Sequence, residues 1–178
     1  MPALLNVAYN RSNTITLILD NRTTAMTGHQ EHPGTGHTLQ EQEASRVELE
    51  PLVRAMGVER VHTVDPYNLQ QVEDALRACL ASEGPAVVIA RRECALLPEA
   101  RRHYLPLQVE ADTCIACGTS RKVGCPALQR SEEVYAKTGK AKTAIDPLLC
   151  TGCEICAQVC PVNAILFRAQ LQAVEETR

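Results

Sequence analysis

The first hundred residues alternate between short apolar runs and stretches with hydrophobic residues at helical spacing. Residues 14–20 (TITLILD) are apolar and rich in β-branched side chains, which predicts a buried strand, and residues 60–64 and 86–90 are interpreted in the same way. Apolar positions three or four residues apart predict helices over 49–56 and 68–80. Because strands alternate with helices, the pattern predicts a parallel α/β sheet.

The second of these predicted helices carries two further signals. Asn68, with Gln71 three residues later, resembles a capping box that opens the helix. Cys79 extends the apolar stripe of the same helix, so we interpret it as a core residue. Cys94 follows a charged stretch, and the sequence assigns no chemistry to it.

The last seventy residues are dominated by cysteines at fixed spacing. Cys150, Cys153 and Cys156 are separated by two residues each, and Cys160 follows directly before Pro161. This is the run with which bacterial ferredoxins hold a [4Fe–4S] cluster, and in two-cluster proteins its fourth cysteine ligates the other cluster. The run therefore predicts a protein that handles electrons one at a time.

A second run lies upstream, and it is incomplete. It contains Cys114, Cys117 and Cys125, but Ser120 stands where its third cysteine is expected. If the fourth cysteine of each run binds the cluster of the other run, two ligand sets result. The complete set is Cys150, Cys153, Cys156 and Cys125. The defective set is Cys114, Cys117, Cys160 and Ser120. Serine oxygen binds iron less readily than thiolate. The second site therefore has three possible states: a [3Fe–4S] cluster, a serine-ligated [4Fe–4S] cluster, or no cluster.

Composition and charge narrow the remaining classes of function. Zinc also binds Cys-x2-Cys pairs, but it requires two pairs and not a trio followed by Cys-Pro. The chain has 178 residues, a net charge of −3 and only 3% aromatic residues, so nothing supports nucleic acid binding. No apolar run approaches the roughly 20 residues of a membrane helix, so no membrane contact is expected. No targeting segment is visible, and the cytoplasm is the default location.

A polar, glycine-containing loop follows the first predicted strand and is a candidate binding site. Ligands of parallel α/β sheets bind at the carboxyl ends of the strands. At this position Asn21 can offer its amide oxygen, and Thr23 its backbone carbonyl, to a hard cation such as Mg²⁺. The alternative is an ordinary surface loop. The nearby histidines favour a loop over a transition-metal site, because proline and glycines separate them: His29, His32 and His37.

The residues PALLNVAYNRSNTITLILDNRTTAMTGHQEHPGTG closely resemble the α subunits of the indolepyruvate:ferredoxin oxidoreductases. These belong to the thiamine-diphosphate-dependent 2-oxoacid:ferredoxin oxidoreductases, in which a ferredoxin-like domain follows the thiamine domain. The resemblance implies three segments. Residues 1–100 are a partial thiamine-diphosphate-binding domain with a parallel sheet, residues 105–168 a small α+β ferredoxin-like domain with [4Fe–4S] sites, and residues 169–178 a polar helical tail.

The same resemblance implies a reaction, partners and site residues. An arylpyruvate, coenzyme A and oxidised ferredoxin give acyl-CoA, CO2 and reduced ferredoxin, with a β subunit as partner. Asn21 and Thr23 match two Mg²⁺ ligands of the family, and Thr27 and Gly28 match the loop near the diphosphate of thiamine diphosphate. His29 is a candidate proton donor near the thiazolium ring.

The chain departs from the family in two places. The Gly-Asp half of the Mg²⁺ motif should lie further upstream than the residues before Asn21 reach, so we expect a carboxyl-terminal fragment that is inactive alone. Ser120 stands where the family typically has cysteine. Two alternatives to the enzyme fragment follow. One is a stand-alone iron–sulfur electron carrier, and the other is an inactive remnant that folds poorly because half a domain leaves apolar surface uncovered.

Paired basic residues are a last, weaker signal. Arg91 with Arg92, and Arg101 with Arg102, can contact coenzyme A or an acidic ferredoxin. We favour the interpretation that both pairs are solvated surface.

Overall fold

A computed structural model describes residues 2–103 and 105–167 of the chain. The chain divides into two compact units, Met1–Leu97 and Pro98–Arg178. None of the helices in the described residues is long and apolar enough to span a membrane. The predicted polar tail at 169–178 lies outside the described residues.

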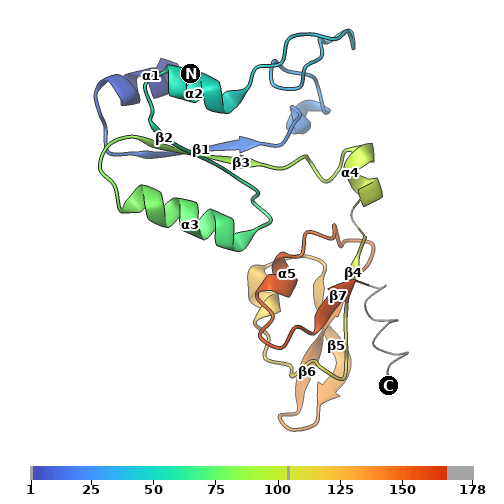
Figure 1. Ribbon diagram of the computed structural model, residues 1–178. Helices are drawn as coiled ribbons and strands as arrows, with labels where there is room; N and C mark the ends of the chain where they lie inside the picture. Colours follow the sequence, from blue (N-terminus) through green and yellow to red (C-terminus); the bar gives the residue numbers. More distant parts are fainter. Residues whose placement is uncertain (1, 104, 168–178) are drawn as a thin grey trace. The chain divides into compact units, whose positions relative to one another are not determined.

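Three parallel strands form the sheet of the first unit (Figure 1). β1 (Ile15–Asp20) and β2 (Arg60–Val64) flank β3 (Ala86–Arg91), so the strand order is β1-β3-β2. Each outer strand begins its pairing opposite the first residue of β3. All three strands lie where the apolar runs predicted them, and the predicted parallel α/β sheet is confirmed.

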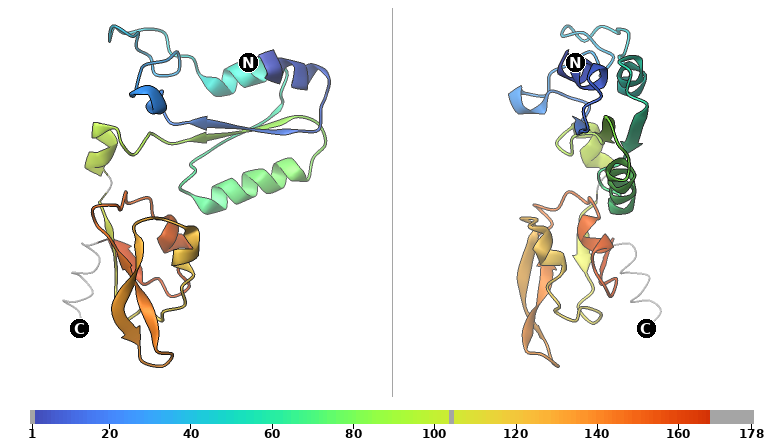
Figure 2. Two further views of the ribbon diagram at one scale, coloured as in Figure 1. Left: turned by 180° about the vertical axis from the view of Figure 1, so that it is seen from behind. Right: turned by 90° about the vertical axis from the view of Figure 1, so that its left-hand side faces the viewer.

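Helices cover both faces of this sheet (Figure 2). α1 (Pro2–Tyr9) and α2 (Leu49–Ala55) pack on one face, and α3 (Leu69–Leu80) packs on the other. Strand residues point alternately to the two faces, so the sheet divides its core into two clusters. Around α1 and α2 the buried side chains are Leu4, Val53, Val58, Val61, Val87 and Ile89; around α3 they are Val64, Ala75, Cys79, Ala86 and Val88.

Helix α3 begins at a cap that matches the prediction in part. The side-chain oxygen of Asn68 accepts a hydrogen bond from the Gln71 N–H at 3.1 Å, as a capping box requires. The Gln71 side chain does not return to Asn68. It accepts a hydrogen bond from the Asp65 N–H at 3.3 Å and so anchors the preceding loop. Cys79 is 3% exposed in the α3 cluster, which confirms its interpretation as a core residue.

Strand β1 forms one edge of the sheet and carries exposed apolar side chains. Ile15 packs in the α3 cluster, and Leu17 and Leu19 point to the same face because side chains alternate along a strand. Leu17 is 53% exposed and Leu19 is 78% exposed. Within the described residues, apolar sheet surface is therefore open to solvent along β1.

The second unit contains two antiparallel strand pairs. β4 (Leu107–Val109) pairs with β7 (Ile165–Phe167), and these strands lie at opposite ends of the unit's sequence. β5 (Leu128–Tyr135) and β6 (Lys140–Ile145) form a hairpin with an irregularity in its register. The pairing of β4 with β7 brings the two cysteine runs close to each other.

Short helices complete the second unit. They are α4 (Pro98–His103), the 3-10 helix η2 (Ser120–Val123) and α5 (Ile155–Gln158). The buried core is small and includes one of the cysteines: its members are Leu107, Cys156 and Ile165. The unit has the small α+β architecture that the sequence predicted.

Candidate functional site

The loop after β1 lies at the carboxyl edge of the parallel sheet, where ligands of such sheets bind. Asn21 follows the last residue of β1, and its side-chain oxygen accepts a hydrogen bond from the Thr23 N–H at 3.3 Å. The 3-10 helix η1 (Ala25–Thr27) comes next. The Thr24 N–H then donates to the Gln30 carbonyl at 3.0 Å, which closes the loop.

The remaining predicted residues occupy the far side of this loop. The Thr27 hydroxyl donates to the side-chain oxygen of Gln30. Gly28 has φ +115°, and His29 has φ +60°. The Nε2 atom of His29 lies 3.9 Å from the sulfur of Cys94. All residues predicted for thiamine diphosphate therefore lie in the segment that follows β1: Asn21 and Thr23 precede the closed loop, and Thr27, Gly28 and His29 lie within it.

Cys94 is the residue of this edge that sequence reasoning missed. Its backbone N–H donates to the Asn21 carbonyl at 2.9 Å, and its sulfur faces His29. It arrives here because it follows β3, which is the direct neighbour of β1. Strand order was the missing signal, since the apolar pattern alone does not give it.

Both acidic side chains that end the outer strands are paired with arginine. Asp20 is buried, and its carboxylate lies 2.8 Å from Nε of Arg91. The carboxylate of Asp65 lies 2.6 Å from Nη1 of Arg92, whose guanidinium also stacks 4.7 Å from the centre of the Tyr67 ring. The interpretation of Arg91 and Arg92 as solvated surface is therefore wrong, because both guanidinium groups neutralise carboxylates at the sheet edge.

These contacts test how well the loop fits a Mg²⁺–diphosphate group. Asn21 and Thr23 offer neutral oxygen donors, whereas Mg²⁺ in phosphate sites is usually held by one or two carboxylates as well. Asp20 and Asp65 are committed to their arginines. Asn21 and Thr23 therefore fit the neutral half of such a site, and neither Asp20 nor Asp65 supplies its carboxylate half.

The other histidines of the long loop are not gathered into a metal centre. His32 Nδ1 accepts a hydrogen bond from the Gly34 N–H at 3.0 Å, within its own turn. Across residues 2–103 and 105–167, no three His, Cys, Asp or Glu side chains are arranged to hold a single metal ion. An iron–sulfur cluster differs from such a centre, because each cysteine binds a separate iron atom.

Four cysteines predicted for the complete cluster lie close to one another in the second unit. The pKa of Cys156 is raised to about 11, mainly by burial and then by the neighbouring sulfurs of Cys153, Cys150 and Cys125. The Leu107 N–H also donates to the sulfur of Cys150 at 3.4 Å. Cys160 also packs against the core cluster of Cys156, so the assignment of Cys125 to this set by exchange of fourth cysteines stays a prediction.

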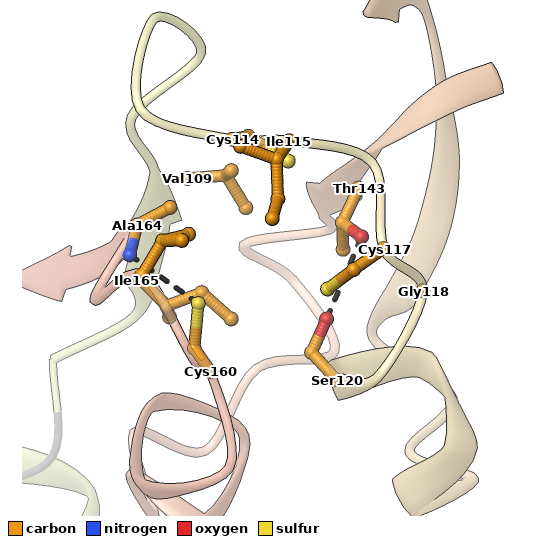
Figure 3. Close-up of a pocket in the computed structure, with 11 residues that line it drawn as sticks. Val109, Cys114, Ile115, Cys117, Gly118, Ser120, Thr143, Cys160, Ala164 and Ile165 are labelled. Carbon is orange, nitrogen blue, oxygen red and sulfur yellow. Dashed lines mark hydrogen bonds between the residues drawn. The ribbon is translucent and has the colours of Figure 1, made fainter. Parts of the chain in front are cut away.

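The second set lines a small cavity (Figure 3). The sulfurs of Cys117 and Cys160 and the hydroxyl of Ser120 are directed toward the same space, and Cys114 also lines it. The Ala164 N–H donates to the Cys160 sulfur at 3.3 Å. Hydrogen bonds from the Thr119 side chain and backbone lower the pKa of Cys117, which favours its thiolate.

The cavity has the right donors but little room. Its volume is about 10 Å³, which is at the lower limit for holding one water molecule. Its walls include Ile115 and Val109, whose side chains stand between the sulfurs in Figure 3. Three thiols and a hydroxyl are donors that fit an iron–sulfur cluster, whereas the space between them is small.

Two known families match the chain, one in each unit. Residues 1–90 match the C-terminal TPP-binding domain of thiamine pyrophosphate enzymes. The chain belongs to this family. Residues 143–166 match the 4Fe-4S binding domain, which includes Cys150, Cys153, Cys156 and Cys160. The upstream run, with Ser120, lies outside that match.

Relatives in three archaea resemble almost the whole chain. Each is an indolepyruvate oxidoreductase subunit IorA. The chain is 42% identical to that of Pyrococcus abyssi over 170 residues, which covers 92% of this chain and 25% of the relative. The chain is 41% identical to the relative of Archaeoglobus fulgidus over 169 residues, which covers 93% of this chain and 26% of the relative. It is 41% identical to that of Thermococcus kodakarensis over 170 residues, which covers 92% of this chain and 25% of the relative. The chain thus spans about a quarter of the length of these relatives, and no solved structure matches it.

Proposed function

We propose that the chain is part of the α subunit of a thiamine-diphosphate-dependent 2-oxoacid:ferredoxin oxidoreductase, with arylpyruvates such as indolepyruvate as substrates. One observation carries this proposal: a thiamine pyrophosphate enzyme domain and a 4Fe-4S domain follow each other in one chain, as in relatives that match 92% of it. In the proposed reaction an arylpyruvate, coenzyme A and oxidised ferredoxin give acyl-CoA, CO2 and reduced ferredoxin.

In this proposal the loop after β1 holds Mg²⁺ and the diphosphate. Asn21 offers its side-chain oxygen and Thr23 its carbonyl, while Thr27 and Gly28 line the diphosphate. Bound thiamine diphosphate supplies the electron sink for decarboxylation. His29 is the proposed proton donor beside the reacting centre, and the sulfur of Cys94 lies 3.9 Å from its Nε2 atom.

The carboxylate that this loop lacks is proposed to come from another polypeptide region of the complete α subunit. Asp20 and Asp65 are each paired with an arginine, so neither carboxylate is proposed as a ligand. The chain alone is therefore expected to be inactive. The exposed Leu17 and Leu19 along β1 are compatible with further protein packing there, because apolar patches of this kind mark contact surfaces.

The second unit is proposed to carry the electrons away one at a time. Cys125, Cys150, Cys153 and Cys156 hold a [4Fe–4S] cluster, and ferredoxin takes the electrons from it. The N–H of Leu107 that donates to the Cys150 sulfur would raise the potential of a bound cluster, because hydrogen bonds stabilise the charge of the reduced form.

The test joins the chain to the amino-terminal region of an IorA relative and supplies a β subunit. The assembled protein should reduce ferredoxin when given indolepyruvate and coenzyme A. Asn21→Ala should weaken binding of thiamine diphosphate with Mg²⁺, measured by calorimetry. Asn10→Ala is the matched control, since its exposed side chain donates a hydrogen bond to the Asn6 carbonyl of the preceding helix α1. If wild type and Asn21→Ala bind thiamine diphosphate with Mg²⁺ equally well, the assignment of Asn21 as a metal ligand is wrong. If the assembled protein reduces ferredoxin with pyruvate but not with indolepyruvate, the assignment of arylpyruvates as substrates is wrong.

A second candidate, a stand-alone electron carrier, is favoured by one observation. Every cysteine of both sets lies in the second unit, so that unit supplies all the proposed cluster ligands by itself. In that case the loop 27–37 has no part in function. Deleting it should leave electron transfer to ferredoxin unchanged, whereas the enzyme proposal requires that arylpyruvate-dependent reduction is lost.

A further inference from the structure

The cavity of the second unit presents three thiols and one hydroxyl. Cys114 is 8% exposed, Cys117 is exposed and Cys160 is half-buried, and all three line the cavity with Ser120. Cys114, Cys117 and Ser120 lie outside the residues that match the 4Fe-4S binding domain.

The Ser120 hydroxyl already has a partner. Its oxygen lies 3.5 Å from the hydroxyl oxygen of Thr143 on β6, and each of the two residues is only 6% exposed. The pair is neutral and shielded from water. To bind iron, Ser120 would have to give up this contact with Thr143. Its oxygen is also a harder ligand than thiolate sulfur, and both points disfavour ligation by Ser120.

The thiols offer the opposite chemistry. Soft thiolate sulfur is the ligand that iron–sulfur clusters select, and each thiolate serves one iron atom. Three thiolates therefore satisfy three irons. A fourth iron at this site would face the hydroxyl pair of Ser120 and Thr143 in place of a thiolate.

We propose that this cavity holds a [3Fe–4S] cluster on Cys114, Cys117 and Cys160, with Ser120 and Thr143 lining the corner without iron. This inference rests on the iron–sulfur part of the proposed function, and it requires neither thiamine diphosphate nor a substrate. The chain then carries two clusters of different types, a four-iron cluster and a three-iron cluster.

The test uses the full chain, reconstituted anaerobically with ferrous iron and sulfide. Electron paramagnetic resonance of the oxidised sample should show the near-isotropic signal of a [3Fe–4S] cluster, because an oxidised [4Fe–4S]²⁺ cluster is silent. Reduction with dithionite should produce the separate signal of the four-iron cluster. Iron and sulfide analysis should give one three-iron and one four-iron cluster per chain.

Variants of Ser120 and Thr143, which line the corner without iron, distinguish a three-iron cluster from a serine-ligated four-iron cluster. Ser120→Ala removes the hydroxyl and should leave the three-iron signal unchanged, and Thr143→Val is its matched control across the hydroxyl pair. Ser120→Cys supplies the fourth thiolate, so the oxidised three-iron signal should disappear and one more iron per chain should be bound. Cys117→Ala should remove the three-iron signal and leave the four-iron signal.

Three results would overturn the proposal. Loss or change of the oxidised signal in Ser120→Ala, with the Thr143→Val signal intact, would make Ser120 a ligand. Iron for a single four-iron cluster and no oxidised signal would show that the cavity binds no cluster. Persistence of the oxidised signal in Cys117→Ala would place the three-iron cluster elsewhere. Because the four-iron signal is recorded in the same samples, each of these failures is distinct from a failure of the proposed function.

Discussion

Gly152 lies inside the cluster-binding run, between Cys150 and Cys153, and its replacement by alanine should disrupt the second unit. Gly152 has φ +68°, in the left-handed region that glycine favours. A Cβ atom at this position would lie 2.5 Å from the Leu105 carbonyl oxygen and 3.3 Å from two further backbone atoms of Leu105. Backbone atoms cannot turn away as a flexible side chain can, so the loop between the cysteines has to shift.

Two costs add in Gly152→Ala. The left-handed conformation costs a residue with a Cβ atom roughly 1–2 kcal/mol. Forcing an extra carbon into a filled space costs about 1–3 kcal/mol more. Gly139 distinguishes the conformational cost from the steric cost. It has φ +64° in the β5–β6 turn, and a Cβ atom added there would have nothing within 4 Å. Gly139→Ala should therefore show the conformational cost alone.

Native-state hydrogen exchange, followed by mass spectrometry on β4 and β7, measures the free energy of opening of the second unit. Gly152→Ala should lower this free energy of opening by about 2–5 kcal/mol in total. The loss should exceed that of Gly139→Ala by about 1–3 kcal/mol. Iron bound after anaerobic reconstitution should fall in Gly152→Ala and stay unchanged in Gly139→Ala. Equal losses in the two variants would refute the reasoning from the Leu105 contact.

Three further predictions concern the cysteines, a helix cap and a buried ion pair. In the cluster-free chain, iodoacetamide at about pH 7.5 should modify Cys117 faster than Cys156. The thiolate is the reactive form, and the pKa of Cys117 is lowered while the pKa of Cys156 is about 11. Peptide mass spectrometry should show that the difference in modification rate becomes smaller as the pH rises toward 11. Asn68→Ala should cost about 1 kcal/mol in urea unfolding followed by circular dichroism, while Asn68→Asp keeps the cap. Asp20→Asn should cost about 2 kcal/mol in the same assay, because it removes the nearer of the two carboxylates that face the half-buried Arg91, the other being Glu48 at 3.9 Å; an unchanged free energy of unfolding would contradict this.

The sheet of the first unit was predictable from the sequence because its signals are local. The apolar run at 14–20 and the stripes at 49–56 and 68–80 each specify an element through side-chain spacing alone, and their boundaries agree with β1, α2 and α3 within about two residues. The parallel arrangement followed from the alternation of elements. The order β1-β3-β2 did not follow, because strand order depends on contacts between segments that are distant in the chain.

That order explains what the sequence missed at the candidate thiamine loop. Arg91 and Arg92 read as surface charges, yet the position of β3 between the other strands directs them to the carboxylates of Asp20 and Asp65. The contact of Cys94 with His29 has the same origin. Ion pairs and thiol–imidazole contacts across a sheet edge produce no periodic pattern in the sequence, so the sequence alone does not predict them.

The sequence by itself determined the chemistry of this protein, because cysteine spacing and a loop of oxygen donors are covalent features of the chain. It also determined that Ser120 interrupts one cysteine run. Only the tertiary structure decided what surrounds that serine: β6 brings Thr143 to its hydroxyl, and the pairing of β4 with β7 brings Cys160 to the cavity of Cys114 and Cys117. Ligand type is a property of residues, whereas burial and hydrogen-bond partners depend on segments that meet only when the chain folds.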